Sequence, residues 1–334
     1  MNKNPEQHAK GRRRESDNPH SVVPRPLGGN ALPKENTHIM FINDIVNSLQ
    51  CDETRSRLQA NYEALCIGCV MADTFFYSSN KDIVKISEKL HGKDGENTNE
   101  LTFDLLDRAR QHKSENLLCL SIGYISHCVF DIIFHPVIYS LAGNYYDENA
   151  SIRKQAIYNH RLLETRLDNN INNRYYLDKI LSANDKLIHE VLDIISAKYK
   201  FTSGDLIKAY KKQLFGNKCF RNSFTHRIVY QLNKLRILNL ESILPLFYNH
   251  LNIDDMEIND TINYRDILDG QKIQVSLSDI ISSAKDETIK RMNAAFDYYN
   301  DIIDKADAIQ IIRGESLDTG KEGYSVYKVL YSHT

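Results

Sequence analysis

Apolar residues recur at helical spacing along most of the chain from residue 37 onward. The first such segment carries five of them on one face, which are Ile39, Ile42, Ile45, Val46 and Leu49. The Asn36-Thr37 pair ahead of it supplies a capping residue for this helix. Further helices are predicted over residues 53–69, 99–112, 115–135, 150–167, 175–198, 203–214, 223–247 and 277–306. Strand-like alternation is scarce before a short run over residues 325–331, so we expect a mostly α-helical protein.

Composition divides the chain into a tail, one large domain and a short extension. Residues 1–33 are polar, hold five of the seven prolines and carry three consecutive arginines at 12–14, which is typical of a disordered tail. The remaining chain shows no repeat and no internal boundary, and 42% hydrophobic residues are enough for a substantial core. We therefore expect an N-terminal tail at 1–33, a single multi-helix all-α domain at 34–306 and a C-terminal extension at 307–334.

Charge, cysteine spacing and hydropathy limit the classes of protein to which this chain can belong. The formal net charge of −2 gives no basic field of the kind that non-specific nucleic-acid binding needs. The six cysteines form no regular framework, and the lone Cys66-x-x-Cys69 pair is favoured as core. The tail lacks the apolar centre of a secretory signal, so we expect a cytoplasmic protein, or one exported without a classical signal peptide. Polar residues interrupt the apolar runs at 64–77 and 117–141, so no transmembrane segment is predicted.

The most informative stretch is residues 117–146, where three metal-type ligands interrupt an apolar run. His127, Asp131 and His135 stand at positions i, i+4 and i+8, which share one helix face and lie roughly 6 Å apart along the axis. Pro136 disfavours helical geometry at the residue before it, so we expect the helix to end near His135. The alternative is a buried helix whose histidines only satisfy their own hydrogen bonds.

The spacing of this face favours more than one metal ion. The outer histidines are about 12 Å apart along the helix, whereas zinc–nitrogen bonds measure only about 2.0–2.1 Å. Asp131 has two carboxylate oxygens and could lie between two cations, each served by one histidine. The sequence therefore predicts a cluster in which this aspartate is shared.

Other candidate ligands lie on separate segments. His38 opens the first predicted helix, Asp73 follows an apolar run, and His91 stands in Leu-His-Gly. His160 and Glu164 form an i, i+4 pair in HRLLE, a spacing suited to one ion held from two successive helix turns. An isolated pair of this kind is usually a solvated helix face, so the combination of segments carries the prediction.

The order of TH, GCVMADTFFY, LHG, GYISHCVFDIIFHP and HRLLE resembles the zinc-dependent phospholipase C family, over roughly residues 36–299. The resemblance implies an all-α fold with about two to three zinc ions. It assigns the first zinc to Asp73, His91, His127 and Asp131. It assigns the second to His135, His160 and Glu164, and the third to His38 with the shared Asp131.

This sequence departs from the family pattern in two ways, one at the third zinc site and one at His135. In the secreted enzymes a mature N-terminal tryptophan completes the third zinc site, but this chain has no tryptophan and 37 residues precede His38. Unless the tail is removed, the third site must use water or another group, or stay empty. His135 follows Asp131 by four residues, which is closer than in the secreted phospholipases.

The resemblance implies hydrolysis of a phosphodiester through a zinc-activated water. We expect a phospholipase C that cleaves glycerophospholipid to diacylglycerol and a phosphorylated head group, with Asp73 as the catalytic carboxylate that orients or deprotonates the water. Phe75, Phe76 and Tyr77 could line a head-group pocket, although a core role for at least two of these rings is favoured.

Two other functions stay open, and the expected partners are limited to substrate and membrane. The alternatives are a zinc-dependent single-strand nuclease and a non-catalytic interaction protein that metal stabilises. The substrate is expected to be a phospholipid or another phosphodiester, with peripheral membrane contact as an option and no protein partner predicted. The locally basic stretch 208–221 is explained by a solvated helix face, or by contact with anionic lipid.

Overall fold

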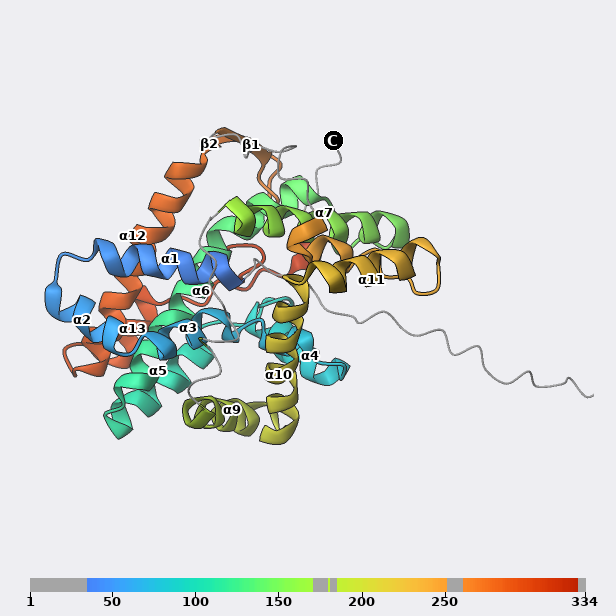
Figure 1. Ribbon diagram of the computed structural model, residues 1–334. Coiled ribbons are helices and arrows are strands. Elements are labelled where there is room, and N and C mark those ends of the chain that lie inside the picture. The colour runs from blue at the N-terminus through green and yellow to red at the C-terminus, as the bar shows by residue number, and fades with distance from the viewer. Residues whose placement is uncertain (1–34, 171–179, 181–184, 251–260, 330–334) are drawn as a thin grey trace, which may run out of the picture.

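A computed structural model describes residues 35–170, 180, 185–250 and 261–329 (Figure 1). The predicted tail at 1–33 lies outside these residues. The first half of the chain forms α1 (Glu35–Ser48), α2 (Asp52–Ala60), α3 (Tyr62–Met71), η1 (Thr74–Tyr77), α4 (Lys81–Leu90), α5 (Glu100–His112), α6 (Glu115–Ala142) and α7 (Ala150–Asn170). The second half forms α9 (Asp185–Tyr199), α10 (Ser203–Phe220), α11 (Ser223–Lys234), η2 (Leu244–Leu246), η3 (Tyr248–His250), β1 (Thr261–Arg265), β2 (Lys272–Ser276), α12 (Leu277–Tyr299), α13 (Lys305–Ile311) and η5 (Val326–Lys328). In the part of the chain that the structure describes, the protein is all-α apart from one antiparallel hairpin of β1 and β2.

Helix α6 is the central element, and α1, α3, α5, α7 and α12 pack around it (Figure 1). The Ser114 side chain accepts a hydrogen bond from the Leu117 amide and so caps its start. By length and composition α6 could cross a membrane, with a mean hydropathy of 1.9 in its most apolar window. That window is 89% buried inside the protein, and it is the only candidate span among the described residues. We therefore interpret α6 as a core helix.

Two glycines bring α3 and α6 into backbone contact. A Cβ added at Gly68 would lie 2.0 Å from the Leu120 carbonyl oxygen, and one added at Gly123 would lie 2.0 Å from that of Leu65. Any side chain at either position would force the helices apart. This close crossing fixes the height of α3 on α6, and α3 leads directly into Asp73.

The expected end of the helix near His135 is wrong. α6 continues through Pro136 to Ala142, because apolar side chains are buried on both sides of the proline and tertiary packing outweighs the local cost of the missing hydrogen bond. The chain at Gly320 lies close to this turn, since an added Cβ there would be 2.8 Å from the Ile132 carbonyl oxygen and 3.7 Å from the Pro136 ring.

Several predicted boundaries also differ from the structure. The helix predicted at 203–214 extends to residue 220, the one at 223–247 ends at residue 234, and the one at 277–306 divides into α12 and α13. The first half of the helix predicted at 175–198 lies largely outside the described residues. The hairpin was not expected, although its Asp269-Gly270 turn is a hairpin signal, and residues 326–328 form a 3-10 turn where a strand was predicted.

Replacing Gly123 with alanine is expected to lower the free energy of unfolding by about 3 kcal/mol, near the upper end for overpacked cores. The added methyl group meets backbone atoms that cannot rotate away. Thermal or urea unfolding measures the change. Gly204→Ala is the control, because its nearest atom would be 3.9 Å away, and it should unfold within about 1 kcal/mol of the wild type. Equal stability of the two variants would contradict the close crossing.

Candidate metal centre

Eight of the side chains predicted as ligands converge on one buried region of the protein. They come from α1, α6, α7, the junction of α3 with η1 and the end of α4, and each is at most 2% exposed. The set is His38, Asp73, His91, His127, Asp131, His135, His160 and Glu164. Three groups among them bring ligand atoms within 4.8 Å of one another.

The first group combines Asp73, His91 and His127 with one oxygen of Asp131. The His127 Nε2 atom lies 3.0 Å from Asp131 Oδ2 and 3.5 Å from Asp73 Oδ1. The His91 Nε2 atom lies 3.3 Å from Asp73 Oδ1 and 3.7 Å from Asp131 Oδ2. Two imidazoles and two carboxylates thus face one point, which suits a tetrahedral zinc site.

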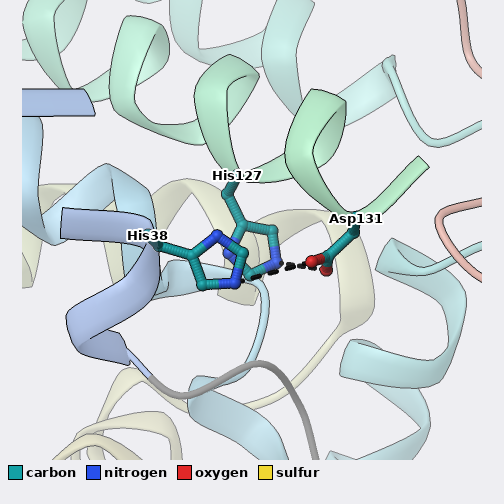
Figure 2. A group of neighbouring side chains, drawn as sticks. All are labelled: His38, His127 and Asp131. Atoms are coloured by element: carbon teal, nitrogen blue, oxygen red, sulfur yellow. Dashed lines mark ion pairs between the residues drawn. The ribbon is translucent and has the colours of Figure 1, made fainter. Parts of the chain in front are cut away.

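The second group contains His38, His127 and Asp131. The other oxygen of Asp131, Oδ1, lies 3.5 Å from His38 Nε2 and 3.8 Å from His135 Nε2. Figure 2 shows the rings of His38 and His127 side by side, both directed at this carboxylate. The two rings are stacked, with centroids 4.1 Å apart and planes 20° from parallel. This division of the two oxygens fits the bridging role inferred from the helix spacing.

The third group contains His135, His160 and Glu164. Glu164 Oε1 lies 2.6 Å from His160 Nε2 and 4.0 Å from His135 Nε2. The third group is next to the other two groups because His135 Nε2 lies 3.8 Å from Asp131 Oδ1. The eight residues therefore form one continuous centre, in which Asp131 lies between the groups.

The unsatisfied polar atoms of this centre are the main argument for a metal. Both oxygens of Asp73, Asp131 and Glu164, and the Nε2 atoms of all five histidines, are buried without a hydrogen-bond partner in the described part of the chain. Unpartnered buried carboxylates are costly, and a cation removes that cost because it takes the lone pairs of both ligand types. The donor set therefore fits zinc ions.

Backbone carbonyls fix the orientation of three of these rings. The Nδ1 atom of His91 lies 2.7 Å from Ser87 O, that of His127 lies 2.8 Å from Cys69 O, and that of His135 lies 3.1 Å from Leu317 O. A carbonyl oxygen can only accept, so each Nδ1 carries the proton and donates it. In the neutral ring, Nε2 then presents its lone pair to the centre, as metal-binding histidines do.

The pKa values of the side chains around Asp131 are shifted by neighbouring charges, whereas those of the third group are shifted mainly by burial. Burial opposes charge on His127, but the carboxylates of Asp131 and Asp73 outweigh it and raise its pKa to about 9. Burial also opposes charge on Asp131, but the surrounding histidines hold its pKa well below the usual range. Burial dominates in the third group, where it lowers the pKa of His160 to about 4 and raises that of Glu164.

The three aromatic residues after Asp73 have different surroundings. Phe75 is fully buried in the hydrophobic core. The Phe76 ring packs against His91 with centroids 5.2 Å apart, so it borders the centre. The Tyr77 hydroxyl donates to Glu35 Oε1 at 2.9 Å, which ties η1 to the start of α1. Of the three, Phe76 is the residue whose ring packs against the ring of a candidate ligand among the described residues.

The start of α1 is capped by a residue that the sequence analysis missed. Asn36 and Thr37 lie inside the first turn, so the prediction that this pair caps the helix from outside is wrong. Asp168 of α7 accepts from the Thr37 amide at 2.7 Å and from the Asn36 side chain at 3.1 Å. A carboxylate at a helix N-terminus is favoured by the helix dipole. Asp168 stands eight residues after His160 and four after Glu164, the same spacing that drew attention to α6.

A segment near the end of the described chain also supports the centre, although no motif predicts it. Residues 312–320 run beside α4 and α6. The Leu317 amide donates to His91 O at 2.9 Å, and its carbonyl accepts from His135 Nδ1. Asp318 Oδ1 lies 3.6 Å from the same Nδ1 and accepts from the Tyr139 hydroxyl at 2.8 Å. This segment therefore contacts ligands of two different groups.

A buried ion pair anchors this segment to the core. Glu315 is 4% exposed and pairs with Arg291 of α12 through N–O distances of 2.9 and 3.1 Å. The Glu315 carbonyl oxygen accepts from the Thr98 hydroxyl at 2.6 Å. Two-point contact of a guanidinium with a carboxylate fixes direction as well as distance.

Comparison with known proteins gives one result. The family model described as zinc dependent phospholipase C matches residues 37–217, more than half of the chain. No curated protein and no solved structure matches the chain. The matched region contains all eight candidate ligands and ends before the segment 312–320.

Elemental analysis of protein purified without a tag is expected to find about two or three zinc ions per chain. Asp131→Asn removes one of the charged oxygens that the groups share, so the metal content should fall sharply. His127→Ala should also lower it. A content of one ion or none that Asp131→Asn leaves unchanged would mean that this helix face is structural.

Asp318→Ala is expected to weaken zinc binding by about 10- to 100-fold, the usual cost of losing a group that orients a metal ligand. Titration against a competing chelator measures the affinity, and the absorption spectrum of the cobalt-substituted protein reports the ligand geometry. Asp318→Asn keeps an acceptor for Tyr139 and should retain part of the affinity. The control is Asp307→Ala, an exposed change in α13. An affinity unchanged by Asp318→Ala would exclude this role for Asp318.

Proposed function

The chain belongs to the zinc-dependent phospholipase C family, and we propose that it hydrolyses the phosphodiester bond of glycerophospholipids. The products would be diacylglycerol and a phosphorylated head group. The observation that carries this proposal is the convergence of three carboxylates and five imidazoles whose inward-facing atoms lack hydrogen-bond partners within the described ranges. The family match and these metal-binding groups support a metal-dependent hydrolase.

The eight ligands would hold the metal ions in the groups described above. Bound zinc supplies Lewis acidity toward phosphate oxygens and lowers the pKa of a coordinated water. The anionic charge of a phosphodiester also suits the positive end of α1, since the first turn of this helix carries His38.

Asp73 is the best candidate for the catalytic carboxylate. Both of its oxygens lie in the centre without hydrogen-bond partners among the described residues, so one can face a metal while the other accepts a proton. Its neighbours in space are the Nε2 atoms of His91 and His127, at 3.3 and 3.5 Å from Oδ1. Asp73 follows α3, and the close crossing of α3 with α6 limits its movement relative to the His127 ring on α6.

The apolar surroundings of the centre restrict the access of water. The Phe130 ring lies edge-on to His38 at 5.2 Å, and Phe76 covers one side of His91. Exclusion of bulk water strengthens the interactions of a bound phosphate with charged groups. The single-strand nuclease alternative would use the same ligands, so a choice of substrates separates the two activities.

Asp73→Asn is expected to lower turnover by at least about 100-fold while most of the zinc stays bound, because the amide cannot accept the proton. Release of phosphorylated head group from short-chain phosphatidylcholine and phosphatidylglycerol measures turnover, and elemental analysis measures zinc. Asp82→Asn is the matched control, since this exposed carboxylate pairs only with Lys85 among the described ion pairs.

Three outcomes decide the proposal. Lipid hydrolysis that Asp73→Asn abolishes and Asp82→Asn leaves intact supports it. Hydrolysis of single-stranded DNA but not of lipid by the zinc-loaded protein would favour the nuclease. Unchanged lipid turnover in Asp73→Asn would remove Asp73 from the mechanism.

A further inference from the structure

Helix α11 carries the largest concentration of exposed apolar side chains in the described part of the chain. None of its residues is buried, and Phe224 is 69% exposed. Beyond the helix end, Leu235 is 65% and Ile237 is 61% exposed. We define the α11 surface as the exposed side chains of α11 and the turn after it, which are Phe224, Arg227, Ile228, Tyr230, Gln231, Lys234, Leu235, Arg236 and Ile237.

The spacing of these residues forms an amphipathic helix with its apolar side turned outward. Phe224, Ile228 and Leu235 stand at i, i+4 and i+11, which returns each to the same side of the helix. The opposite side, with His226 and Asn233, faces the protein and is half-buried. Exposed apolar side chains gathered on one helix face are typical of a surface that contacts a membrane or another molecule.

The charges around the α11 surface have one sign. Residues 206–240 contain eight lysines and arginines and no aspartate or glutamate, although the whole chain has a net charge of −2. The eight are Lys208, Lys211, Lys212, Lys218, Arg221, Arg227, Lys234 and Arg236. Within the described ranges, Arg227, Lys234 and Arg236 form no ion pair with an acidic side chain. The positive charge of this surface is therefore available to an anionic partner.

We propose that the α11 surface docks on an anionic lipid bilayer, with Phe224, Ile228 and Leu235 inserted among the lipids and the basic side chains at the head groups. Helices of this composition bind membrane interfaces through apolar burial and attraction to anionic lipid. A second copy of this chain is disfavoured because two such surfaces would repel each other. Nucleic acid is disfavoured because Ile228, Leu235 and Ile237 have no ring on which a base could stack, which leaves only Phe224 and Tyr230 for stacking.

The α11 surface is connected to the metal centre through the corner between α10 and α11. Arg221 at this corner donates to Asn36 Oδ1 at 2.7 Å, and Asn36 precedes His38 by two residues. The start of α1 and the base of α11 are thus joined directly, as their neighbouring positions in Figure 1 show. Docking would place the metal centre close to the lipid head groups. The choice of lipid as partner rests on the proposed function, but the binding itself needs no turnover.

Co-sedimentation of the zinc-loaded full chain with vesicles tests this surface. Binding to vesicles of phosphatidylcholine with phosphatidylglycerol is expected to be at least about tenfold tighter than to phosphatidylcholine alone. The double variant Arg227→Glu, Lys234→Glu should lose this preference. The double variant Phe224→Ser, Ile228→Ser should weaken binding to the mixed vesicles by at least about tenfold, because apolar burial is lost.

Matched controls come from exposed positions elsewhere. Ile302→Ser changes an isoleucine that is 68% exposed in the turn between α12 and α13, which Figure 1 shows on the opposite side of the molecule. Lys272→Glu reverses an exposed charge on β2. Both should bind vesicles like the wild type, and circular dichroism should show the same helix content in all variants.

The possible outcomes distinguish a failure of the membrane-docking surface from a failure of the proposed phospholipase activity. Vesicle binding that depends on α11 in a chain without phospholipase activity would support the surface and overturn only the proposed function. Lipid hydrolysis with vesicle binding that the α11 variants leave unchanged would overturn the surface alone. Self-association, or binding to single-stranded DNA, that the α11 variants abolish while vesicles are not bound would also overturn it.

Discussion

The sharing of Asp131 between neighbouring groups of ligands is the constraint on which the rest of the structure depends. One carboxylate must reach histidines from α1, α4 and α6 at the same time, so those elements have little freedom to move. α6 supplies the carboxylate from a buried position, and the other helices are held at fixed heights around it. The close crossing at Gly68 and Gly123 fixes the position of α3, and the Asp168 cap fixes the start of α1. Both contacts therefore help to hold the histidines and carboxylates around Asp131.

Orientation of the centre comes largely from the backbone. Three histidines donate to carbonyl oxygens of α3, α4 and the segment 312–320, and none of these contacts depends on the identity of the side chain that supplies the oxygen. The arrangement therefore tolerates change in the residues around the centre, provided that the helices keep their positions. It also explains why the ligand motifs alone do not show what orients the ligands.

The sequence predicted which side chains converge better than it predicted what supports them. His127, Asp131 and His135 could be recognised because helix periodicity is local, and a polar face in an apolar run stands out. Pro136 misled the prediction because the packing that keeps the following turn helical is tertiary and involves segments far along the chain. Asp168 carried a usable signal, since it continues the spacing of His160 and Glu164. Leu317 and Asp318 carried none, because their contacts arise only from tertiary folding.

The segment 312–320 has a consequence for biosynthesis. It follows every ligand in the sequence, so a ribosome delivers all eight ligands before the residues that orient His91 and His135. Domains generally fold as units during synthesis. The restraints on these two imidazoles therefore become available only when the chain beyond residue 317 has been synthesised, and the centre cannot reach its final arrangement before then.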